Sequence, residues 1–343
     1  MARRAKKKVS GQVSGQQSAE DRLIARHFKP IARHPGALGL TDDAALLTPP
    51  AGHALVITAD AVVGGVHFFP DDPADAIAKK ALRVNLSDLA AKGAQPAGFV
   101  LTLALPKGVG DNWLKSFARG LGADAKKYGC PLLGGDTVLT PGAVTISITA
   151  FGTVPDGTLL RRSGARVGDH VVVTGTIGDA ALGLKLRKER GARRRWNLNA
   201  VLQRHLLGRY LVPEPRCALA EAFRQLASAG MDVSDGLAGD LGKLCRVSGV
   251  GAEIDAAKVP LSKAARAALV AEPGLLKTIL TGGDDFEVVA TVPPASLDVF
   301  LTAARVVGVS VTAIGRVTAA KEVQFIGPGG RPLSFARASF SHF

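Results

Sequence analysis

The chain contains few of the residues that would place it among disulfide-stabilised, zinc-binding or membrane-anchored proteins. Its 343 residues include 3 cysteines, too few and too widely spaced for a disulfide framework or a zinc-ligand pattern. No apolar run approaches the ~20 residues that span a bilayer. No apolar stretch follows the basic start of the chain, as it would in a secretory signal. We therefore expect a protein of the reducing cytoplasm without a membrane anchor.

Aromatic residues are also scarce, at 5% of the chain, although hydrophobic residues reach 47%. Val, Leu, Ile and Ala must therefore fill the core. The length is sufficient for two domains, each with a core of its own.

The net charge of +14 is unevenly placed. Residues 1–18 carry five basic and no acidic groups, and residues 187–195 carry six basic groups and one acidic group. Both segments could contact nucleic-acid phosphates. Because no aromatic platform or zinc pattern accompanies them, we favour a solvated tail and loop, and nucleic-acid binding is the weaker alternative.

The order of the apolar patterns predicts two α/β domains after a disordered tail. We expect the tail at residues 1–18, the N-terminal domain at 19–155 and the C-terminal domain at 156–343. In the N-terminal domain we expect helices at 19–28, 74–92 and 111–128, a loop at 36–43, and strands at 54–60, 99–105, 131–137 and 144–151. In the C-terminal domain we expect strands at 170–174, 288–292, 311–317 and 323–326 and helices at 181–188, 199–207, 215–229, 237–247 and 296–307.

Two carboxylates, a hydroxyl and a glycine lie together in the stretch Met231-Asp-Val-Ser-Asp-Gly-Leu237. It is predicted to join a strand end, a tight turn and a helix start, with Ser234 or Asp235 as the N-cap. A helix N-terminus favours phosphate, and two nearby carboxylates favour a hard cation. Alone, the stretch is explained as well by an ordinary capped turn. A phosphate chain carrying Mg²⁺ would use both of its features.

Acidic residues recur beside glycines at the predicted ends of apolar strands. These are Asp43, Asp60, Asp136, Asp232, Asp235, Asp284 and Asp285, with Asp88 inside a predicted helix. Converging carboxylates repel one another unless cations lie among them. Mg²⁺ is the expected cation because it takes oxygen ligands and bridges phosphates. The sequence has no Gly-x-x-x-x-Gly-Lys-Ser/Thr phosphate loop, so metals would hold most of a nucleotide.

A series of motifs also follows a specific order along the chain. They are Asp42-Asp-Ala-Ala-Leu-Leu47, Thr58-Ala-Asp60, Gly65-Val-His-Phe68, Lys80 to Pro96, Gly134-Gly-Asp-Thr137, Arg162-Ser-Gly164, Val173 to Asp179, Asp232-Val-Ser-Asp-Gly236 and Gly282-Gly-Asp-Asp-Phe-Glu287. Over roughly residues 20–343, the chain closely resembles the thiamine-monophosphate kinase family. That family belongs to the superfamily of aminoimidazole ribonucleotide synthetase, selenophosphate synthetase and a hydrogenase maturation protein. Gly65-Val-His-Phe68 and the terminal Ser341-His-Phe343 point to this member.

The resemblance implies that the γ-phosphoryl group of ATP passes to thiamine monophosphate, giving thiamine pyrophosphate, with several Mg²⁺ ions assisting. Its Mg²⁺ ligands would be Asp43, Thr58, Ala59 through its backbone, Asp60, Asp88, Asp136, Asp232 and Asp235. Its ATP contacts would be Gly135, Asp136, Arg162 and Ser234, and its substrate contacts His67, Asp284 and Phe340. No side chain is expected to act as a general base, because the acceptor phosphate oxygen is already ionised.

The resemblance also implies a fold. It is the two-domain aminoimidazole ribonucleotide synthetase-like fold, of the α/β (α+β) class, with a C-terminal α/β sandwich. The N-terminal domains of a homodimer would pair into a β-barrel. Two residues depart from the family pattern: Thr41 replaces the usual Gly before the first acidic pair, and Asp284 replaces the usual Glu, one methylene longer.

Other members of the superfamily remain as alternatives. Selenophosphate synthetase needs a Cys or selenocysteine near its N-terminus, but Cys130 is the first cysteine here. The hydrogenase maturation protein ends in a reactive Cys, whereas this chain ends in His342-Phe343. Aminoimidazole ribonucleotide synthetase is therefore the main enzymatic alternative. A nucleic-acid-binding protein that uses the basic tail is the alternative from a different class.

Overall fold

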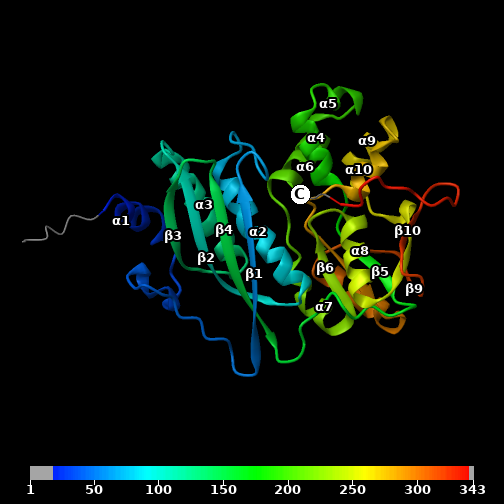
Figure 1. Ribbon diagram of the computed structural model, residues 1–343, viewed down its shortest axis with the longest axis horizontal. Helices are drawn as coiled ribbons and strands as arrows, with labels where there is room; N and C mark the ends of the chain where they lie inside the picture. Colours follow the sequence, from blue (N-terminus) through cyan, green and yellow to red (C-terminus); the bar gives the residue numbers. More distant parts are fainter. Residues whose placement is uncertain (1–17, 340–343) are drawn as a thin grey trace, which may run out of the picture.

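A computed structural model describes residues 18–339 and contains two α/β units, each built on one sheet (Figure 1). Phe340 lies outside the described residues. The sheet of the N-terminal unit has the order β1-β4-β2-β3. Its strands are β1 (His53–Val63), β4 (Thr145–Pro155), β2 (Gln95–Pro106) and β3 (Leu132–Thr140). Only β2 and β3 pair in parallel. The sheet does not close on itself, so β1 and β3 form its opposite edges.

Two helices cover one face of this sheet, α2 (Ala74–Ala91) and α3 (Asp111–Lys127). The strand pattern follows from this single cover, because neighbouring side chains point to opposite faces. On β4, Ile146, Ile148 and Ala150 are buried, while the residues between them are half-buried. On β1, the face away from the helices leaves Ile57 60% exposed. One face of the N-terminal sheet is therefore a core face and the other is largely open.

The first described residues lie near β3 and α3. It forms α1 (Ala19–Leu23), the π-helix η1 (Ile24–Phe28) and the 3₁₀-helix η2 (Pro35–Leu40). Ser18 caps α1, and its side chain accepts a hydrogen bond from the Asp21 backbone N–H. The predicted helix at 19–28 is confirmed, with a change from α to π geometry inside it. The predicted loop at 36–43 was wrong in part, since η2 covers its first residues.

The C-terminal unit has a six-stranded sheet in the order β10-β7-β9-β5-β8-β6. Its strands are β5 (His170–Thr174), β6 (Ala229–Val233), β7 (Gly251–Asp255), β8 (Glu287–Val292), β9 (Val311–Thr318) and β10 (Val323–Ile326). The helices are α4 (Asp179–Lys188), α5 (Ala192–Arg195), α6 (Ala200–Leu211), η3 (Cys217–Leu219), α7 (Ala220–Leu226), α8 (Leu237–Ser248), η4 (Ala256–Lys258), α9 (Lys263–Ala271), α10 (Leu275–Thr281), η5 (Pro294–Ser296) and α11 (Leu297–Val306). Within residues 18–339, no helix is long and apolar enough to cross a membrane.

The C-terminal half of α2 joins the two units. The Lys92 ammonium, at the end of α2, donates a hydrogen bond to the Gly230 carbonyl in β6 over 2.8 Å. Arg83 pairs with the buried carboxylate of Asp124 and also donates to the Pro213 carbonyl of the C-terminal unit. The first sheet and β6 therefore approach α2 from different sides, and polar residues of α2 lie between them.

Two sequence predictions about strands and helices were wrong. The predicted helix at 215–229 is broken, because α7 ends at Leu226 and Ala229 already belongs to β6. All five residues of β6 are buried and pair with β8, so sheet pairing overrode the helical pattern. Asp60 and Asp136 do not end their strands, since β1 continues to Val63 and β3 to Thr140.

Candidate active site between the two units

Four carboxylates from both units lie close enough to repel one another at α2, and we call them the boundary cluster: Asp60, Asp88, Asp232 and Asp235. β1 supplies Thr58 and Asp60, alternate residues on its helix-facing side. The Thr58 hydroxyl donates to Asp88 Oδ2 over 2.5 Å. The Asp60 backbone N–H donates to the side-chain oxygen of Asn85 over 3.1 Å. The Asn85-Leu-Ser-Asp88 motif thus ties α2 to β1 at the cluster.

The boundary cluster carries excess negative charge. Partial burial raises the pKa of Asp60 to about 6, and repulsion from Asp88 and Asp235 adds to the shift. Asp232 is only 4% exposed. Burial, followed by repulsion from Asp88 and Asp240, raises its pKa well above the usual range. Carboxylates that repel one another in this way favour binding of cations among them.

The turn after β6 differs from its prediction. Gly236, not Ser234 or Asp235, is the N-cap of α8, and no side chain caps that position. The Asp240 carboxylate instead accepts hydrogen bonds from the backbone N–H groups of Asp235 and Gly236. Lys243 bridges the carboxylates of Asp235 and Asp240 at 2.5 and 2.8 Å. The carboxylate of Asp240, in the first turn of α8, therefore accepts the backbone N–H groups that directly precede the helix.

The donor atoms of the cluster suit Mg²⁺. They are carboxylate and hydroxyl oxygens, the ligands that Mg²⁺ prefers in proteins. Within the described residues, no three His, Cys, Asp or Glu side chains are placed to hold one metal ion. Mg²⁺ commonly binds through one or two carboxylates, with water and substrate phosphates completing its shell. The boundary cluster fits a site of this kind, with few protein ligands and with nucleotide phosphates as the remaining ligands.

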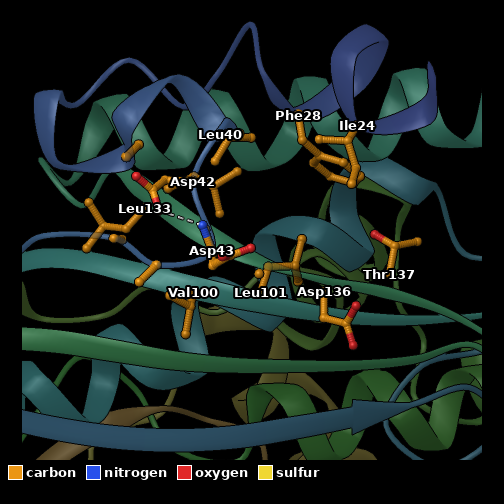
Figure 2. A pocket seen from close by; sticks show the side chains of 16 residues that line it. Ile24, Phe28, Leu40, Asp42, Asp43, Val100, Leu101, Leu133, Asp136 and Thr137 are labelled. Atoms are coloured by element: carbon orange, nitrogen blue, oxygen red, sulfur yellow. Dashed lines mark hydrogen bonds between the residues drawn. The ribbon is translucent and has the colours of Figure 1, made fainter. Parts of the chain in front are cut away.

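A second acidic group lies at the β3 edge of the sheet. Asp43, Gly135 and Asp136 line a cavity of about 330 Å³ (Figure 2). Ile24 and Phe28 of η1 contribute to its apolar wall. The Asp43 backbone N–H donates to Asp42 Oδ1 over 2.8 Å. The cavity combines an apolar wall with carboxylates, which is typical of pockets for ligands with both a flat ring and charged groups.

One chain does not bring the two acidic groups together. Asp60 lies on β1 and Asp136 on β3, the opposite edges of the sheet. Three strand spacings separate these edges, a distance of about 14 Å. The strand register forms one row across the sheet, in which Asp136 pairs with Thr102, Thr102 with Ser147, and Ser147 with Ala61. Asp136 therefore shares the open face with Ala61, whereas Asp60 points to the helix-covered face.

The predicted substrate contacts His67 and Asp284 meet where the two units touch. The Lys80 ammonium donates to the His67 carbonyl over 2.8 Å and to Asp284 Oδ2 over 2.7 Å. Asp284 has a positive φ of 72°, unusual for a residue with a side chain. Its backbone N–H donates to the Ser234 carbonyl over 2.8 Å. His67, Ser234 and Asp284 consequently lie in one region.

The remaining predicted contacts lie nearby or outside the described residues. Phe340 cannot be placed, but Ser339 packs against Gly239 in the first turn of α8. A Cβ built on Gly239 would lie 2.3 Å from Ser339 Cβ. The Arg162 carbonyl accepts a hydrogen bond from Ser248 at the far end of α8. Burial and then the charge of Arg162 lower the pKa of Lys92 to about 8, which places Arg162 near the end of α2.

Sequence reasoning missed the lysines of α2. Asp88 and Lys92 are four residues apart, so they are neighbours on one side of α2, and Lys80 lies about two turns before Asp88. Their positions near the predicted metal ligand Asp88 are the sequence feature that could have revealed these lysines. Lys243 was missed as well, although it lies only eight residues after Asp235.

Comparison with known proteins agrees with this architecture. Residues 41–154 match the family model "AIR synthase related protein, N-terminal domain", and residues 166–327 match "AIR synthase related protein, C-terminal domain". The chain therefore belongs to the AIR synthase related proteins, enzymes with the two-domain α/β fold described above.

The similarity extends over nearly the whole chain to one branch of this family. The thiamine-monophosphate kinase of Caulobacter vibrioides is 42% identical over 85% of this chain and 82% of its own length. That of Escherichia coli K12 is 41% identical over 94% and 97%. The crystal structure of thiamine-monophosphate kinase from Stenotrophomonas maltophilia has a TM-score of 0.79 and 38% identity, covering 91% of this chain and 96% of that one. AaThiL complexed with AMPPCP and TMP has a TM-score of 0.74 and 28% identity, covering 86% and 89%.

The chain belongs to the thiamine-monophosphate kinase family of phosphotransferases.

Proposed function

We propose that this chain transfers the γ-phosphoryl group of ATP to thiamine monophosphate and releases ADP and thiamine pyrophosphate. The observation that carries the proposal is the boundary cluster, a set of repelling carboxylates beside His67 and Asp284. Two phosphate-bearing substrates can approach each other only where their charge is neutralised. The AMPPCP and TMP complex of the structural relative AaThiL adds support from a protein of the same family.

The residues of this chain would bind, orient and neutralise rather than move protons. The acceptor oxygen of a phosphate monoester is ionised near neutral pH, so alignment and electrostatics are the main requirements. Mg²⁺ ions held by residues of this chain would supply the positive charge that neutralises the phosphates. We assign them to Asp43, Thr58, the backbone of Ala59, Asp60, Asp88, Asp136, Asp232 and Asp235.

The two substrates would occupy adjoining places. We assign ATP to Gly135, Asp136, Arg162 and Ser234, where the Arg162 guanidinium offers a forked donor to phosphate. We assign thiamine monophosphate to His67, Asp284 and Phe340, the aromatic ring stacking near a thiamine ring. We also propose the domain limits 19–155 and 156–343. The first domain would bind ATP and Mg²⁺ and form the dimer, and residues of the second would complete the ATP and Mg²⁺ contacts.

We further propose a homodimer in which each active site uses both subunits. The ligands assigned to one metal cluster lie on opposite edges of one sheet, about 14 Å apart. A two-fold axis that sets β3 of one subunit beside β1 of the other would reduce the separation between Asp60 and Asp136 of the partner subunit from three strand spacings to about one. The two carboxylates would then flank the same strand edge from its two faces. The exposed side chains of Leu55 and Ile57, on the open face, would be covered in a barrel formed by the two sheets.

Mixing two inactive variants tests the shared site. Asp60→Asn and Asp136→Asn subunits each lack one ligand, but a mixed dimer would contain one site with both. Random exchange at equal amounts should restore about a quarter of wild-type activity, since half the dimers are mixed and each has one intact site. Activity that stays at the level of the separate variants after demonstrated subunit exchange would contradict the shared site.

The activity itself is tested with purified protein, ATP, Mg²⁺ and thiamine monophosphate. Formation of ADP and thiamine pyrophosphate in equal amounts is expected. Turnover of formylglycinamidine ribonucleotide instead would identify an aminoimidazole ribonucleotide synthetase. Removing residues 1–17, which leaves the Ser18 cap intact, tests the nucleic-acid alternative. Kinase activity should survive that deletion. The alternative would be favoured if neither the full chain nor the shortened chain had kinase activity and the deletion abolished a measurable affinity for nucleic acid.

A further inference from the structure

We infer that Lys80 is a positioning residue for the phosphoryl acceptor. It links two acceptor loops that belong to different units: residues 64–73, the His67 loop, and residues 282–286, the Asp284 loop. The inference rests on the proposed placement of thiamine monophosphate at His67 and Asp284. Lys80 lies in the middle of α2 and is only 2% exposed. A buried ammonium needs partners for its charge and its hydrogens, and the identity of those partners assigns its role.

Each partner of the Lys80 ammonium belongs to one of the two acceptor loops or to the helix that packs on them. It donates to the His67 carbonyl over 2.8 Å and to Asp284 Oδ2 over 2.7 Å. It also lies 4.2 Å from the centre of the Tyr210 ring, a cation–π distance. Tyr210 is itself 2% exposed, and its hydroxyl lies 3.4 Å from the same His67 carbonyl. One cation therefore links residues 67, 210 and 284, which are far apart in sequence.

The His67 loop has further attachments to the C-terminal unit, through α4. Arg187 of α4 pairs with Asp71 and Asp72 at 2.8 Å each. Its guanidinium lies 4.5 Å from the centre of the Phe69 ring, and that ring meets Tyr210 edge-on. These contacts hold the loop as a whole. Among the described residues, Lys80 is the one that connects this loop to the carboxylate of Asp284.

The Asp284 carboxylate depends on this connection. Within residues 18–339, Lys80 is the single side-chain partner of Asp284, whose side chain remains 29% exposed. The exposed part is available to a ligand, while Oδ2 is fixed by the ammonium. The Asp284 side chain is short and starts from a backbone with a positive φ of 72°, so the position of its free oxygen depends closely on how Oδ2 is held. Lys80 sets the direction of the Asp284 carboxylate and fixes its position relative to the His67 loop.

The test is steady-state kinetics of Lys80→Met, with each substrate varied in turn. Met keeps the length and apolar stem but removes the charge. The KM for thiamine monophosphate should rise about tenfold or more, because misplaced contacts weaken acceptor binding. The KM for ATP should change less than twofold. Asp284→Asn should raise the same KM, and the double variant should be no worse than the poorer single variant, because both changes break one link.

Arg83→Met is the matched control. Arg83 lies one turn further along α2, is buried and pairs with a buried carboxylate, yet it contacts neither acceptor loop. It should lower the melting temperature without a selective change in the acceptor KM. A Lys80→Met enzyme with wild-type KM for thiamine monophosphate, or equal changes in both KM values, would overturn the positioning role.

A second variant covers the case in which Lys80→Met does not fold. Tyr210→Leu keeps both charges and removes the ring beneath the ammonium, so a threefold or larger rise in the acceptor KM supports the inference and an unchanged KM overturns it. Absence of turnover by the wild-type enzyme would instead refute the proposed function, which keeps the two failures distinct.

Discussion

Replacing Asp60 with Asn should stabilise the metal-free protein while lowering its activity. In the folded chain the pKa of Asp60 is about 6, compared with a usual value of 3.8. That difference corresponds to about 3 kcal/mol of unfavourable free energy for the ionised group. Because the side chain is exposed to solvent on one side, screening reduces the expected effect to about 1 kcal/mol.

The sign of the pH dependence follows from the direction of this shift. A carboxyl group whose pKa is raised by folding binds its proton more tightly in the folded state. Its contribution to stability is therefore lost as the pH rises from about 4 to about 6, and stays lost above that range. Asp60→Asn should be more stable than wild type by about 1 kcal/mol at pH 7.5, or roughly 1–2 °C for a chain of this length. The difference should vanish near pH 4.

Urea denaturation in EDTA at several pH values measures this effect, and Mg²⁺ titration measures its counterpart. At 100 times its Kd, Mg²⁺ should stabilise the wild type by about 2.7 kcal/mol, and most of that gain should be missing in Asp60→Asn. Catalytic efficiency should fall roughly 100-fold, since a bound metal contributes several kcal/mol. Asp156→Asn makes the same change at an exposed turn after β4 and is the control.

Two results would refute this reasoning. A stability difference that does not depend on pH would show that repulsion in the cluster is not its source. Full stabilisation of Asp60→Asn by Mg²⁺ would remove Asp60 from the metal ligands.

Two further predictions concern the scaffold of the site. Glu287 is fully buried and accepts hydrogen bonds from Thr174, Arg209 and Arg216, so Glu287→Gln should destabilise the fold by about 3–5 kcal/mol in urea denaturation; an unchanged midpoint would show that the arginines find other partners. Gly135→Ala would place a Cβ 1.9 Å from the Leu101 carbonyl oxygen, so β2 and β3 must shift and the KM for ATP should rise about tenfold. Gly134→Ala, where a Cβ meets no atom within 4 Å, should leave that KM unchanged, and equal effects of both changes would contradict the prediction.

The fold was predictable where local patterns and tertiary packing agree. The predicted strands at 170–174 and 323–326 match β5 and β10 residue for residue, and the predicted helix at 74–92 differs from α2 by one residue. The start of α8 was predicted, but its capping residue was not, because Asp240 reaches back from the first turn. Which side chain satisfies the N–H groups at a helix start depends on three-dimensional geometry rather than on residue preference alone.

The candidate site was predictable as a set of residues but not as an arrangement. The motif residues indicate oxygen ligands and phosphate chemistry, and Asp60, Asp88 and Asp232 do lie together. Strand order cannot be read from the chain, so the placement of Asp136 at the opposite edge could not be foreseen. Lys80 was overlooked because a lysine within an apolar helix is normally an exposed residue.

The separation of Asp60 from Asp136 leads to a final prediction about dilution. A single chain contains extensive buried hydrophobic clusters in both units and across their boundary, so a lone subunit should stay folded. It should nevertheless be inactive, because its two acidic groups lie about 14 Å apart. Specific activity should therefore fall when the protein is diluted below the dimer dissociation constant, while its circular dichroism stays unchanged. Dissociation is followed by sedimentation at the same concentrations, and a fully active monomer would refute both the shared site and the assignment of Asp136 to the metal cluster.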